Sequence, residues 1–453
     1  MARASSLSGF PEWLPDGRVV EQHVLDSLRR TFELHGFAGI ETRAVEPLSQ
    51  LLRKGETSKE VYLLRRLQED TEGDDADPDK QLGLHFDLTV PFARYVLEHA
   101  GQLTFPFKRY QIQKVWRGER PQDGRFREFT QADIDVVGAD TLPFHYEVEL
   151  PLVMAEALAA LPVPEVRISV NNRKVAQGFY EAVGLADVES ALRVIDKLDK
   201  IGPAAVAEAL QREAGATAEQ ADQALRLAAI SGTDAAVADQ VLALGARSTL
   251  LDEGLGELVA LLEAAQERSP GTVVADLKIA RGLDYYTGSV YETTLVGHEN
   301  LGSICSGGRY DSLASDGRRT YPGVGLSIGV SRLLARVLGD GLATASRGVP
   351  TAVLVAVTDE EHRAASDRTA QALRARGIPV DVAPTAAKFG KQIRYADRRG
   401  IPFVWFPGED GDEVKDIRSG EQQAADAGSW EPPEEDRWPR VVAAGSAGAA
   451  GER

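Results

Sequence analysis

The 453-residue sequence has a single cysteine, few histidines and no long apolar stretch. The one cysteine, Cys305, excludes an internal disulfide framework and any zinc or iron–sulfur site held by several thiolates. A membrane-spanning helix is not expected, because no run of about 18 apolar residues is present. The N-terminal residues lack the apolar core of a secretory signal, so the expected compartment is the cytoplasm.

Two common kinds of nucleotide-binding loop are also missing. The sequence contains no G-x-x-x-x-G-K-[ST] phosphate loop, and no G-x-G-x-x-G follows an expected strand. Gly323, Gly325 and Gly329 are spaced differently, and close backbone packing is the favoured interpretation of them. The seven histidines show no metal-ligand spacing, and we predict no metal held by the protein itself.

Acidic residues outnumber basic ones, 69 against 51, which gives a formal net charge of −18. This excess argues against a general nucleic-acid-coating protein, although it leaves room for a local basic groove. Hydrophobic residues make up 43% of the chain, enough for a buried core. The length alone favours roughly three domains of ~150 residues.

Hydrophobic patterns divide the chain further. Two long strands are expected at 107–117 and 129–137, joined by a long basic turn. Residues 183–268 are rich in Ala, Leu, Glu and Gln, which favours an inserted helical module. Strand and helix patterns alternate from 352 to 406, as in a compact α/β domain. The last segment, 421–453, is rich in Ala, Gly, Pro and Glu and is predicted to be disordered.

The first group of residues that could carry chemistry lies in the expected hairpin. Seven basic residues oppose only two acidic ones between Lys108 and Arg127, a local net charge of +5. Arginines on a hairpin suit bidentate capture of phosphate, and a solvated charged turn is the alternative. The order Arg-x-Glu, polar loop, Arg-x-Phe favours a site that holds a phosphate, an exocyclic amine and a base face. The seven are Lys108, Arg109, Lys114, Arg117, Arg120, Arg125 and Arg127.

Three later segments carry further candidates. The first, 281–292, reads RGLDYYTGSVYE; on a strand its paired tyrosines would point to opposite faces, and a packed aromatic strand is the alternative to a pocket. The second, 305–313, reads CSGGRYDSL, where paired glycines allow close backbone approach. The third, 323–334, reads GVGLSIGVSRLL and places Arg332 in the first turns of a helix. The helix dipole does not favour a cation there, and an anionic ligand explains it better than a structural salt bridge.

Taken together, these segments resemble the histidyl-tRNA synthetases, a family of class II aminoacyl-tRNA synthetases. The resemblance covers about 10–420, and its most specific parts are FDLTVPFARY (86–95), RGERPQDGRFREFTQADIDVVG (117–138) and RGLDYYTG (281–288). It implies an α+β fold, in which an antiparallel-sheet catalytic domain with a helical insertion precedes an α/β anticodon-binding domain. The implied boundaries are 1–174 and 272–342 for the catalytic domain, 175–271 for the insertion, 350–420 for the anticodon-binding domain and 421–453 for the tail.

The resemblance also implies an ATP site. Arg117 would grip the α-phosphate, Glu119 would accept from the adenine amine, and Phe129 would stack on the adenine ring. Arg332 would contact the γ-phosphate. Arg281, a family-specific arginine beside the α-phosphate, would act with Arg117 as the catalytic pair that neutralises charge growing on the phosphoryl oxygens. A Mg²⁺ ion bound with ATP would bridge the remaining phosphates.

The same resemblance implies a pocket for L-histidine. Asp87 and Thr89 would accept from the α-ammonium, and Gln131 would lie near the backbone groups of the substrate. A neutral imidazole offers one N–H and one lone pair, so it needs an acceptor and a hydroxyl donor. Asp135 and Tyr286 match the residues that fill these two roles in the family. Tyr285 and Tyr310 would form walls. A pocket that pairs both ring nitrogens rejects apolar analogues, so no editing domain is required.

For tRNA(His), the resemblance implies two contact regions. Arg120, Gln122 and Arg125, in the hairpin loop, would meet the acceptor end. Lys388, Lys391 and Arg394 lie on a basic helix of the C-terminal domain, for which an ordinary exposed face is the alternative. The family also implies a homodimer and no membrane partner.

The implied reaction is that of a histidine–tRNA ligase, in which ATP, L-histidine and tRNA give histidyl-tRNA, AMP and pyrophosphate. The alternative within the family is a non-catalytic paralogue of the type that regulates ATP phosphoribosyltransferase. Such paralogues lose site residues or the anticodon domain, whereas this sequence retains both. A generic nucleic-acid-binding groove would leave Asp135 and the paired tyrosines unexplained.

Overall fold

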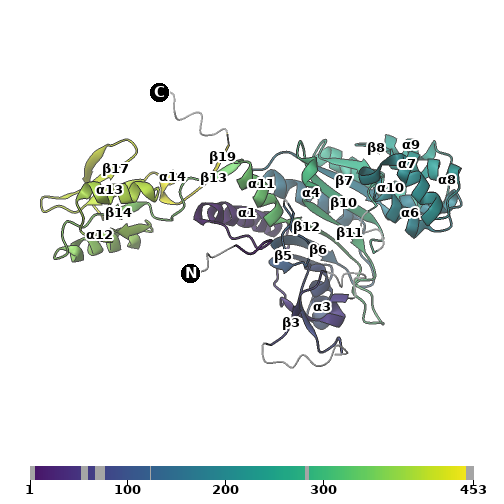
Figure 1. Cartoon of the computed structure of the whole chain (residues 1–453), viewed down its shortest axis with the longest axis horizontal. Coiled ribbons are helices and arrows are strands. Elements are labelled where there is room, and N and C mark those ends of the chain that lie inside the picture. Colours follow the sequence, from purple (N-terminus) through teal and green to yellow (C-terminus); the bar gives the residue numbers. More distant parts are fainter. Residues whose placement is uncertain (1–5, 53–59, 67–76, 123, 281–284, 445–453) are drawn as a thin grey trace. The chain divides into compact units, whose positions relative to one another are not determined.

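The structure is a computed structural model that describes residues 6–52, 60–66, 77–122, 124–280 and 285–444. The chain divides into two compact units (Figure 1). The first comprises Met1–Pro11 and Asp26–Ala335, and the second Glu12–Leu25 and Arg336–Arg453, each as far as it is described. Helix α1 (Pro15–Leu34) contributes residues to both. Within the described ranges, no helix combines the length and apolar composition needed to cross a bilayer.

A nine-stranded, mainly antiparallel sheet organises the first unit. Its strand order is β1-β5-β6-β12-β11-β10-β7-β9-β8, and only the β1–β5 and β7–β9 pairs are parallel. The strands are β1 (Ala38–Gly39), β5 (Phe107–Trp116), β6 (Glu128–Val137), β7 (Val166–Asn172), β8 (Ser231–Gly232), β9 (Val273–Asp276), β10 (Ser289–Leu295), β11 (Cys305–Tyr310) and β12 (Gly323–Gly329).

Strand β6 lies inside this sheet and carries two different faces. Ala132, Ile134 and Val136 alternate along one face and are completely buried. The odd-numbered positions between them are polar and point to the opposite face, because side chains alternate along a strand. Asp133 and Asp135 therefore lie side by side on the same face, although both are buried as well. A polar, buried face at the centre of a sheet marks the place to look for a site.

Helices cover the sheet and form an inserted module. Helix α4 (His145–Ala159) packs against β7 and β12, and α11 (Val330–Gly339) follows β12 directly. Between β7 and β9 the chain forms six helices, with β8 as a short strand among them (Figure 1). These are α5 (Arg173–Ala182), α6 (Val188–Ile195), α7 (Leu198–Glu213), α8 (Ala218–Ala228), α9 (Ala236–Leu242) and α10 (Thr249–Arg268).

A small three-stranded sheet precedes β5 in the chain. Its strand order is β2-β4-β3, and α3 follows β4 and buries Val90, Phe92 and Val96. The elements are β2 (Val45–Pro47), α2 (Leu48–Leu51), β3 (Leu63–Leu64), β4 (Leu82–Leu84) and α3 (Thr89–His99), and a short 3₁₀ turn, η2 (Glu299–Leu301), lies between β10 and β11.

The second unit is built on a five-stranded sheet of order β15-β14-β16-β17-β18, whose first three strands are parallel. Two apolar clusters form its core, one around Trp405 and the other around Val404, which point to opposite faces of β16. The elements are β13 (Ala343–Ala345), β14 (Val353–Val355), α12 (Arg363–Ala375), β15 (Val380–Val382), α13 (Phe389–Arg398), β16 (Phe403–Phe406), β17 (Asp412–Asp416), β18 (Gln422–Ala425), α14 (Glu434–Arg437) and β19 (Val441–Ala443).

The prediction that 421–453 is disordered is wrong for the part that is described, 421–444. Strand β18 pairs with β17, and β19 pairs with β13. Trp430 packs edge-on against Trp405, with ring centroids 5.7 Å apart, and Arg418 forms a bidentate ion pair with Asp436. Composition was a poor guide because one aromatic contact and one ion pair anchor a segment that is otherwise poor in apolar residues.

Candidate active site

Two adjoining cavities lie on residues of β6, β11 and β12 in the first unit. The larger has a volume of about 530 Å³ and the smaller about 100 Å³. Four residues line both cavities: Arg117, Gln131, Ser306 and Ser327. A ligand in the large cavity and a second ligand in the small one would therefore meet beside Arg117.

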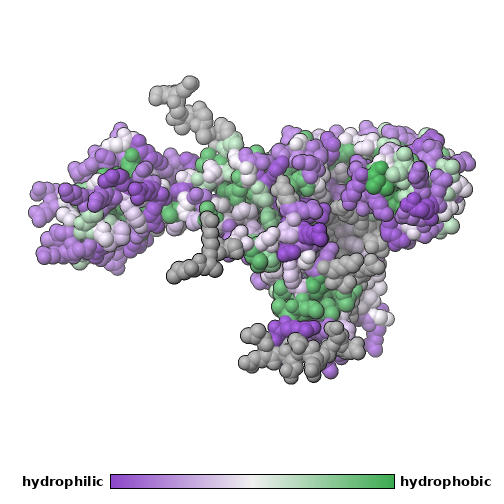
Figure 2. Space-filling view, viewed as in Figure 1, coloured by the Kyte–Doolittle hydropathy of each residue, from purple (hydrophilic) through white to green (hydrophobic). Residues whose placement is uncertain are grey.

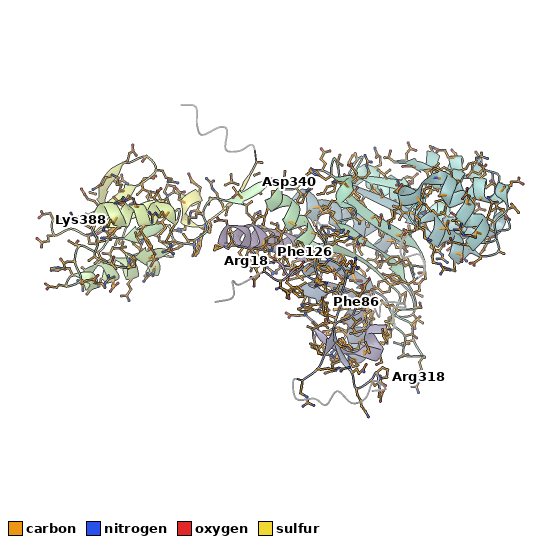
Figure 3. All side chains as sticks on the ribbon, viewed as in Figure 1. Arg18, Phe86, Phe126, Arg318, Asp340 and Lys388 are labelled. Atoms are coloured by element: carbon orange, nitrogen blue, oxygen red, sulfur yellow. The ribbon has the colours of Figure 1, made fainter. Side chains whose placement is uncertain are left out.

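The large cavity brings together residues from the hairpin and from α11. Arg117, Glu119, Phe129 and Arg332 all line it, as does Phe126, which is labelled in Figure 3. The Nε atom of Arg117 donates to the carbonyl oxygen of Phe86 at 3.0 Å, and its guanidinium carbon lies 5.2 Å from the Phe129 ring centroid. These two contacts hold the Arg117 guanidinium beside the face of the Phe129 ring. A ligand with a phosphate and a flat base could bind the guanidinium through its phosphate and stack its base on the ring.

Arg332 is held by backbone carbonyl groups. Its Nε atom donates to the Gly124 oxygen at 3.1 Å, and its Nη1 atom donates to the Ser303 oxygen at 2.5 Å. Gly124 belongs to the turn between β5 and β6, whereas Ser303 precedes β11. The arginine thereby ties two loops together while its side chain lines the cavity.

Both carboxylates and cations line the large cavity. Arg125 forms an ion pair with Glu119 at 3.7 Å. Burial raises the pKa of Glu60, and the neighbouring Arg117 partly opposes that shift. Lys200, from helix α7, also lines the cavity. Sequence reasoning did not single out Glu60 or Lys200, since neither lies in a recognisable motif.

A buried ion pair holds one of the residues that line the small cavity, Asp135. The Nη2 atom of Arg109 lies 2.6 Å from the Oδ2 atom of Asp135, and the Tyr310 hydroxyl donates to the other carboxylate oxygen, Oδ1, at 2.7 Å. Arg109 is completely buried, and its guanidinium carbon lies 4.2 Å from the Phe92 ring centroid. Both contacts hold a charged carboxylate in one orientation at the cavity wall.

Two glycines make room for these side chains. A Cβ atom on Gly325 would lie 2.0 Å from the Oδ1 atom of Asp135, and one on Gly323 would lie 2.5 Å from the Tyr310 ring. Neither contact is possible for a real side chain. The interpretation of Gly323 and Gly325 as close-packing residues is therefore confirmed, and what packs against them is the cavity wall itself.

Polar groups from three elements line the rest of the small cavity. Asp87 and Thr89 come from the start of α3, and Gln131 comes from β6. Asp87 accepts from the backbone N–H of Val90 at 3.1 Å. Gln131 donates through Nε2 to the Ser327 hydroxyl at 2.7 Å, while its Oε1 atom is buried and has no hydrogen-bond partner among the described residues.

The prediction that Tyr285 and Tyr286 lie on a strand is wrong. Strand β10 begins only at Ser289, so the two tyrosines lie in the turn before it. Their ring centroids are 4.0 Å apart, and both rings line the small cavity instead of pointing to opposite faces. The strict alternation of a strand does not apply in a turn, which is why the prediction was wrong.

Asp133 is a site residue that the sequence analysis missed. It lines the small cavity, is fully buried, and accepts from the Ser327 hydroxyl. Burial raises its pKa to about 7, against the lowering effect of Arg109. The signal was available, because Asp133 stands two positions before Asp135 and must share its face of the strand.

The seven basic residues of the hairpin do not act together. Arg117 and Arg125 line the large cavity, whereas Arg109 lies beneath Asp135. Lys108 and Lys114 pair with Glu149 and Glu128. Arg120 and Gln122 are exposed on the turn and line neither cavity. Arg281 lies outside the described residues.

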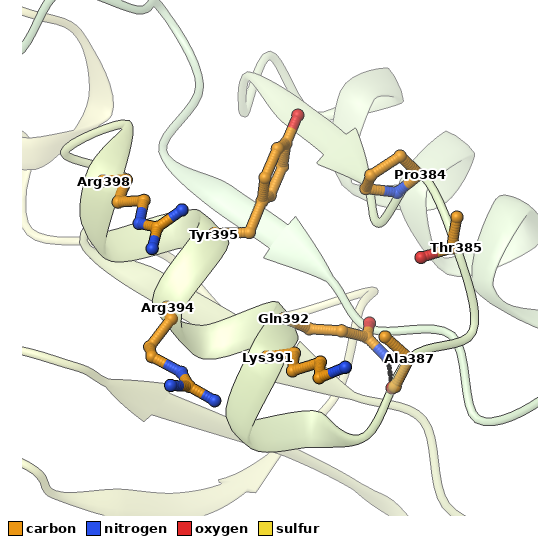
Figure 4. Close-up of a pocket in the computed structure, with 8 residues that line it drawn as sticks. All are labelled: Pro384, Thr385, Ala387, Lys391, Gln392, Arg394, Tyr395 and Arg398. Atoms are coloured by element: carbon orange, nitrogen blue, oxygen red, sulfur yellow. Dashed lines mark hydrogen bonds between the residues drawn. The ribbon is translucent and has the colours of Figure 1, made fainter.

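A further basic surface lies in the second unit. A cavity of about 430 Å³ is lined by Lys391, Arg394 and Arg398 together with Tyr395, all from helix α13 (Figure 4). Lys388 is exposed at the start of the same helix, where Figure 3 labels it. The described residues contain no group of three or more His, Cys, Asp or Glu side chains placed to hold a metal ion.

Comparisons with known proteins agree on one family. Residues 9–333 match the family model described as histidyl-tRNA synthetase, and residues 351–427 match the one described as anticodon binding domain. The chain is 63% identical to the histidine–tRNA ligase of Micrococcus luteus over 98% of this chain and 100% of that protein. It is 59% identical to that of Cutibacterium acnes, covering 98% and 99%.

A solved structure gives the same result for the fold. The chain resembles the crystal structure of histidyl-tRNA synthetase from Nostoc sp. with a TM-score of 0.83 and 37% identity. The similarity covers 94% of this chain and 98% of that one. The α+β prediction for the fold is thus confirmed.

Proposed function

Because the chain belongs to the histidyl-tRNA synthetase family and is a histidine–tRNA ligase, we propose that its two adjoining cavities are where histidyl-adenylate forms. The large cavity takes ATP and the small one takes L-histidine. The observation that carries this assignment is the shared wall at Arg117, where the carboxylate of histidine and the α-phosphate would meet.

In the first step, a histidine carboxylate oxygen attacks the α-phosphorus in line, and the bond to pyrophosphate breaks. The guanidinium of Arg117 stabilises the charge that grows on the non-bridging oxygens, and we propose that Arg281 assists it. Arg117 is suited to this because its Nε atom is already held by Phe86, which leaves its terminal nitrogens for the phosphate.

The remaining ATP contacts follow from the walls of the large cavity. Phe129 offers its ring to adenine, Glu119 accepts from the adenine amine, and Arg332 meets the γ-phosphate. Mg²⁺ would bind with the phosphates as part of the substrate and neutralise their charge. Glu60, in the same cavity, offers a carboxylate with oxygens of the hard type that this ion prefers.

The residues of the histidine pocket bind the imidazole and the α-ammonium of the substrate separately. At the imidazole end, Asp135 accepts the ring N–H, and Tyr286 faces the other ring nitrogen. Arg109 and Tyr310 each contact one oxygen of the Asp135 carboxylate and hold it in place, which supports this role. At the other end, Asp87, Thr89 and Gln131 bind the α-ammonium, while Tyr285 and Tyr310 form walls.

In the second step a ribose hydroxyl at the 3′ end of tRNA(His) attacks the carbonyl carbon of the histidyl group, and the bond to AMP breaks, so that AMP leaves. We propose that Arg120, Gln122 and Arg125 contact the acceptor end, and that Lys388, Lys391 and Arg394 contact the anticodon region. Exposed cations on one helix can bind phosphates without ordered geometry. The proposed domain boundaries are 1–174 and 272–342 for catalysis, 175–271 for the insertion and 350–420 for anticodon binding.

We also propose that the enzyme works as a homodimer in the cytoplasm. Leu63, Leu64 and Leu82 are exposed on the small sheet of the first unit, where Figure 2 shows hydrophobic surface. A contiguous apolar patch on a water-exposed face favours burial against a second copy. Sedimentation analysis at micromolar concentration tests this, and a purely monomeric active enzyme would contradict it.

The test of the function is histidine-dependent exchange of labelled pyrophosphate into ATP, followed by charging of tRNA(His). Both activities are expected. The alternative, a regulatory paralogue without catalysis, predicts no exchange by folded protein. Relatives named as histidine–tRNA ligases over the full length favour the catalytic reading.

A further inference from the structure

Asp133 stands at the end of a short chain of hydrogen bonds between residues that line the small cavity. Ser327 faces it directly across the β6–β12 pair. The Ser327 hydroxyl donates to the Oδ1 atom of Asp133, and its oxygen accepts from the Nε2 atom of Gln131 at 2.7 Å. Asp133 and Gln131 both line the small cavity.

The direction of each hydrogen bond in this chain depends on Asp133. Above about pH 7 the carboxylate of Asp133 is mostly ionised and can only accept, so there the single proton of Ser327 must point to Asp133. The lone pairs of Ser327 are then left to accept from an amide N–H₂ group, which fixes the orientation of the Gln131 side chain. Its carbonyl oxygen, Oε1, must consequently point away from Ser327, and this is the buried atom that has no hydrogen-bond partner among the described residues.

A buried acceptor without a protein partner indicates a ligand that donates. The α-ammonium of histidine is such a donor. If Ser327 had no acceptor beneath it, its hydroxyl could donate to Gln131 instead, and the amide would turn. Gln131 would then present its N–H₂ group to the ammonium, which is repulsive.

We propose that Asp133 is a positioning residue: by accepting from Ser327, it makes Gln131 present its carbonyl oxygen to the α-ammonium of histidine. This inference rests on the proposed function of the pocket. In this role Asp133 does not contact the reacting atoms. The role also explains why a carboxylate is buried at a position where an apolar side chain would pack at a lower cost in free energy.

The charged and titratable groups around Asp133 are consistent with this role. Arg109 on β5 lowers its pKa, whereas Asp135 on β6 and Asp87 near α3 raise it. The Cys305 thiol on β11 also faces it, and burial raises the pKa of that thiol to about 12, so it stays uncharged. The three carboxylates of Asp87, Asp133 and Asp135 are opposed by one guanidinium, that of Arg109. The α-ammonium of histidine would add a second positive charge to this group of side chains.

The experiment compares Asp133→Ala with Asp133→Asn by pyrophosphate exchange and by direct binding of histidine. The alanine variant has no acceptor for Ser327, and we expect its KM for histidine to rise by about tenfold or more with kcat and the KM for ATP changed much less. The asparagine variant retains a carbonyl oxygen for Ser327, and its KM should stay within about threefold of the wild type.

Two analogues separate positioning from general damage to the pocket. Histidinol retains the ammonium, and imidazolepropionate lacks it. Asp133→Ala should weaken inhibition by histidinol as much as it weakens histidine binding, and should leave imidazolepropionate unaffected. Equal weakening of both analogues would overturn the proposal, as would an asparagine variant as defective as the alanine variant.

A double-mutant cycle with Ser327→Ala tests the proposed intermediary. If Asp133 acts through Ser327, Asp133→Ala has little further effect on the KM for histidine once Ser327 is gone. Additive effects would contradict the relay. A wild-type protein without exchange activity would refute the proposed function itself, and this result is obtained before any variant is compared.

Discussion

The guanidinium of Arg109 and the carboxylate of Asp135 form an ion pair with 2.6 Å between Nη2 and Oδ2, and their side chains are 0% and 4% exposed. Neighbouring strands β5 and β6 place the two residues directly opposite each other. A carboxylate buried this deeply would lose much of its charge if it stood alone. The arginine therefore holds the carboxylate of Asp135 in the orientation in which it can accept a proton-bearing ring nitrogen.

Replacing Arg109 by methionine removes the partner of a buried charge while retaining much of the side-chain volume. We expect a loss of stability of roughly 3–5 kcal/mol, because breaking a buried pair leaves an uncompensated carboxylate. Urea unfolding measures this loss. The KM for histidine should rise as well, since Asp135 then loses the contact that orients its carboxylate.

The matched control is the double variant Arg109→Met/Asp135→Asn, which removes both charges. It should recover most of the lost stability while remaining defective in histidine binding. A double variant as unstable as Arg109→Met alone would mean that the guanidinium acts through packing on Phe92 and not through charge.

Asp133 makes the stability of the protein depend on pH. Its folded-state pKa of about 7 lies above the ordinary value of 3.8, so folding favours the protonated form. Well below pH 3.8 the carboxyl is protonated in both states and has no effect on this balance. As the pH rises towards 7, the unfolded state ionises first, and stability is lost across that window.

Thermal unfolding of Asp133→Asn against wild type at several pH values measures the effect. The variant should be the more stable protein at pH 8, and the difference should shrink towards pH 4. A difference that does not change with pH would contradict the burial argument for this carboxyl. The control is Asp140→Asn, an exposed position just beyond β6, which should show no such trend.

The sequence allowed much of this architecture to be predicted, because its strongest patterns are local. Strands β5 and β6 were expected within a residue or two of their observed ends, since each is a ten-residue segment rich in strand-forming residues beside a polar turn. Arg332 was placed correctly in the first turn of a helix. Arg117, Glu119, Phe129 and Arg332 were assigned by resemblance, and the structure brings them to one cavity.

The errors have physical causes that local patterns cannot reveal. The segment 421–444 was assigned to a disordered tail on composition, yet Trp430 finds a partner, Trp405, that is distant in sequence. Arg109 was counted with the phosphate-binding cations, because sequence alone does not say which face of the hairpin is buried. Asp133 was overlooked because the resemblance singled out Asp135.

Trp430 is expected to stabilise the second unit. Its ring packs against Phe403 and Trp405, and Trp430→Ala should lower the stability of this unit by about 3 kcal/mol. Trp438, which is 56% exposed, is the matched control, and Trp438→Ala should change stability little. Limited proteolysis and thermal unfolding measure both. Equal effects of the two substitutions would refute the role given to Trp430.

Arg332→Lys should be far from conservative. A lysine cannot donate to the carbonyl groups of Gly124 and Ser303 together, because it lacks the forked geometry of a guanidinium. We expect the KM for ATP to rise and the exchange rate to fall by about tenfold or more. Arg336→Lys on the same helix is the control; its partner is Asp340, at 2.8 Å, and its activity should be retained.

Binding of tRNA(His) should depend on salt partly through helix α13. Lys391 and Arg394 are exposed on this helix and line one cavity (Figure 4). If each neutralises a phosphate, removing one should reduce the slope of log K against log salt concentration by about 0.7. Filter binding between low and moderate salt measures that slope for Lys391→Ala and Arg394→Ala.

The matched control for these two variants is Arg368→Ala, an exposed arginine on helix α12 of the same unit. Its removal changes the net charge equally, so a general field effect would alter all three slopes alike. Only the α13 variants should show the reduced slope, and histidine activation should be unchanged in all of them because no tRNA takes part in that step. Identical slopes for Arg368→Ala and Lys391→Ala would assign the effect to net charge and not to a binding surface on α13.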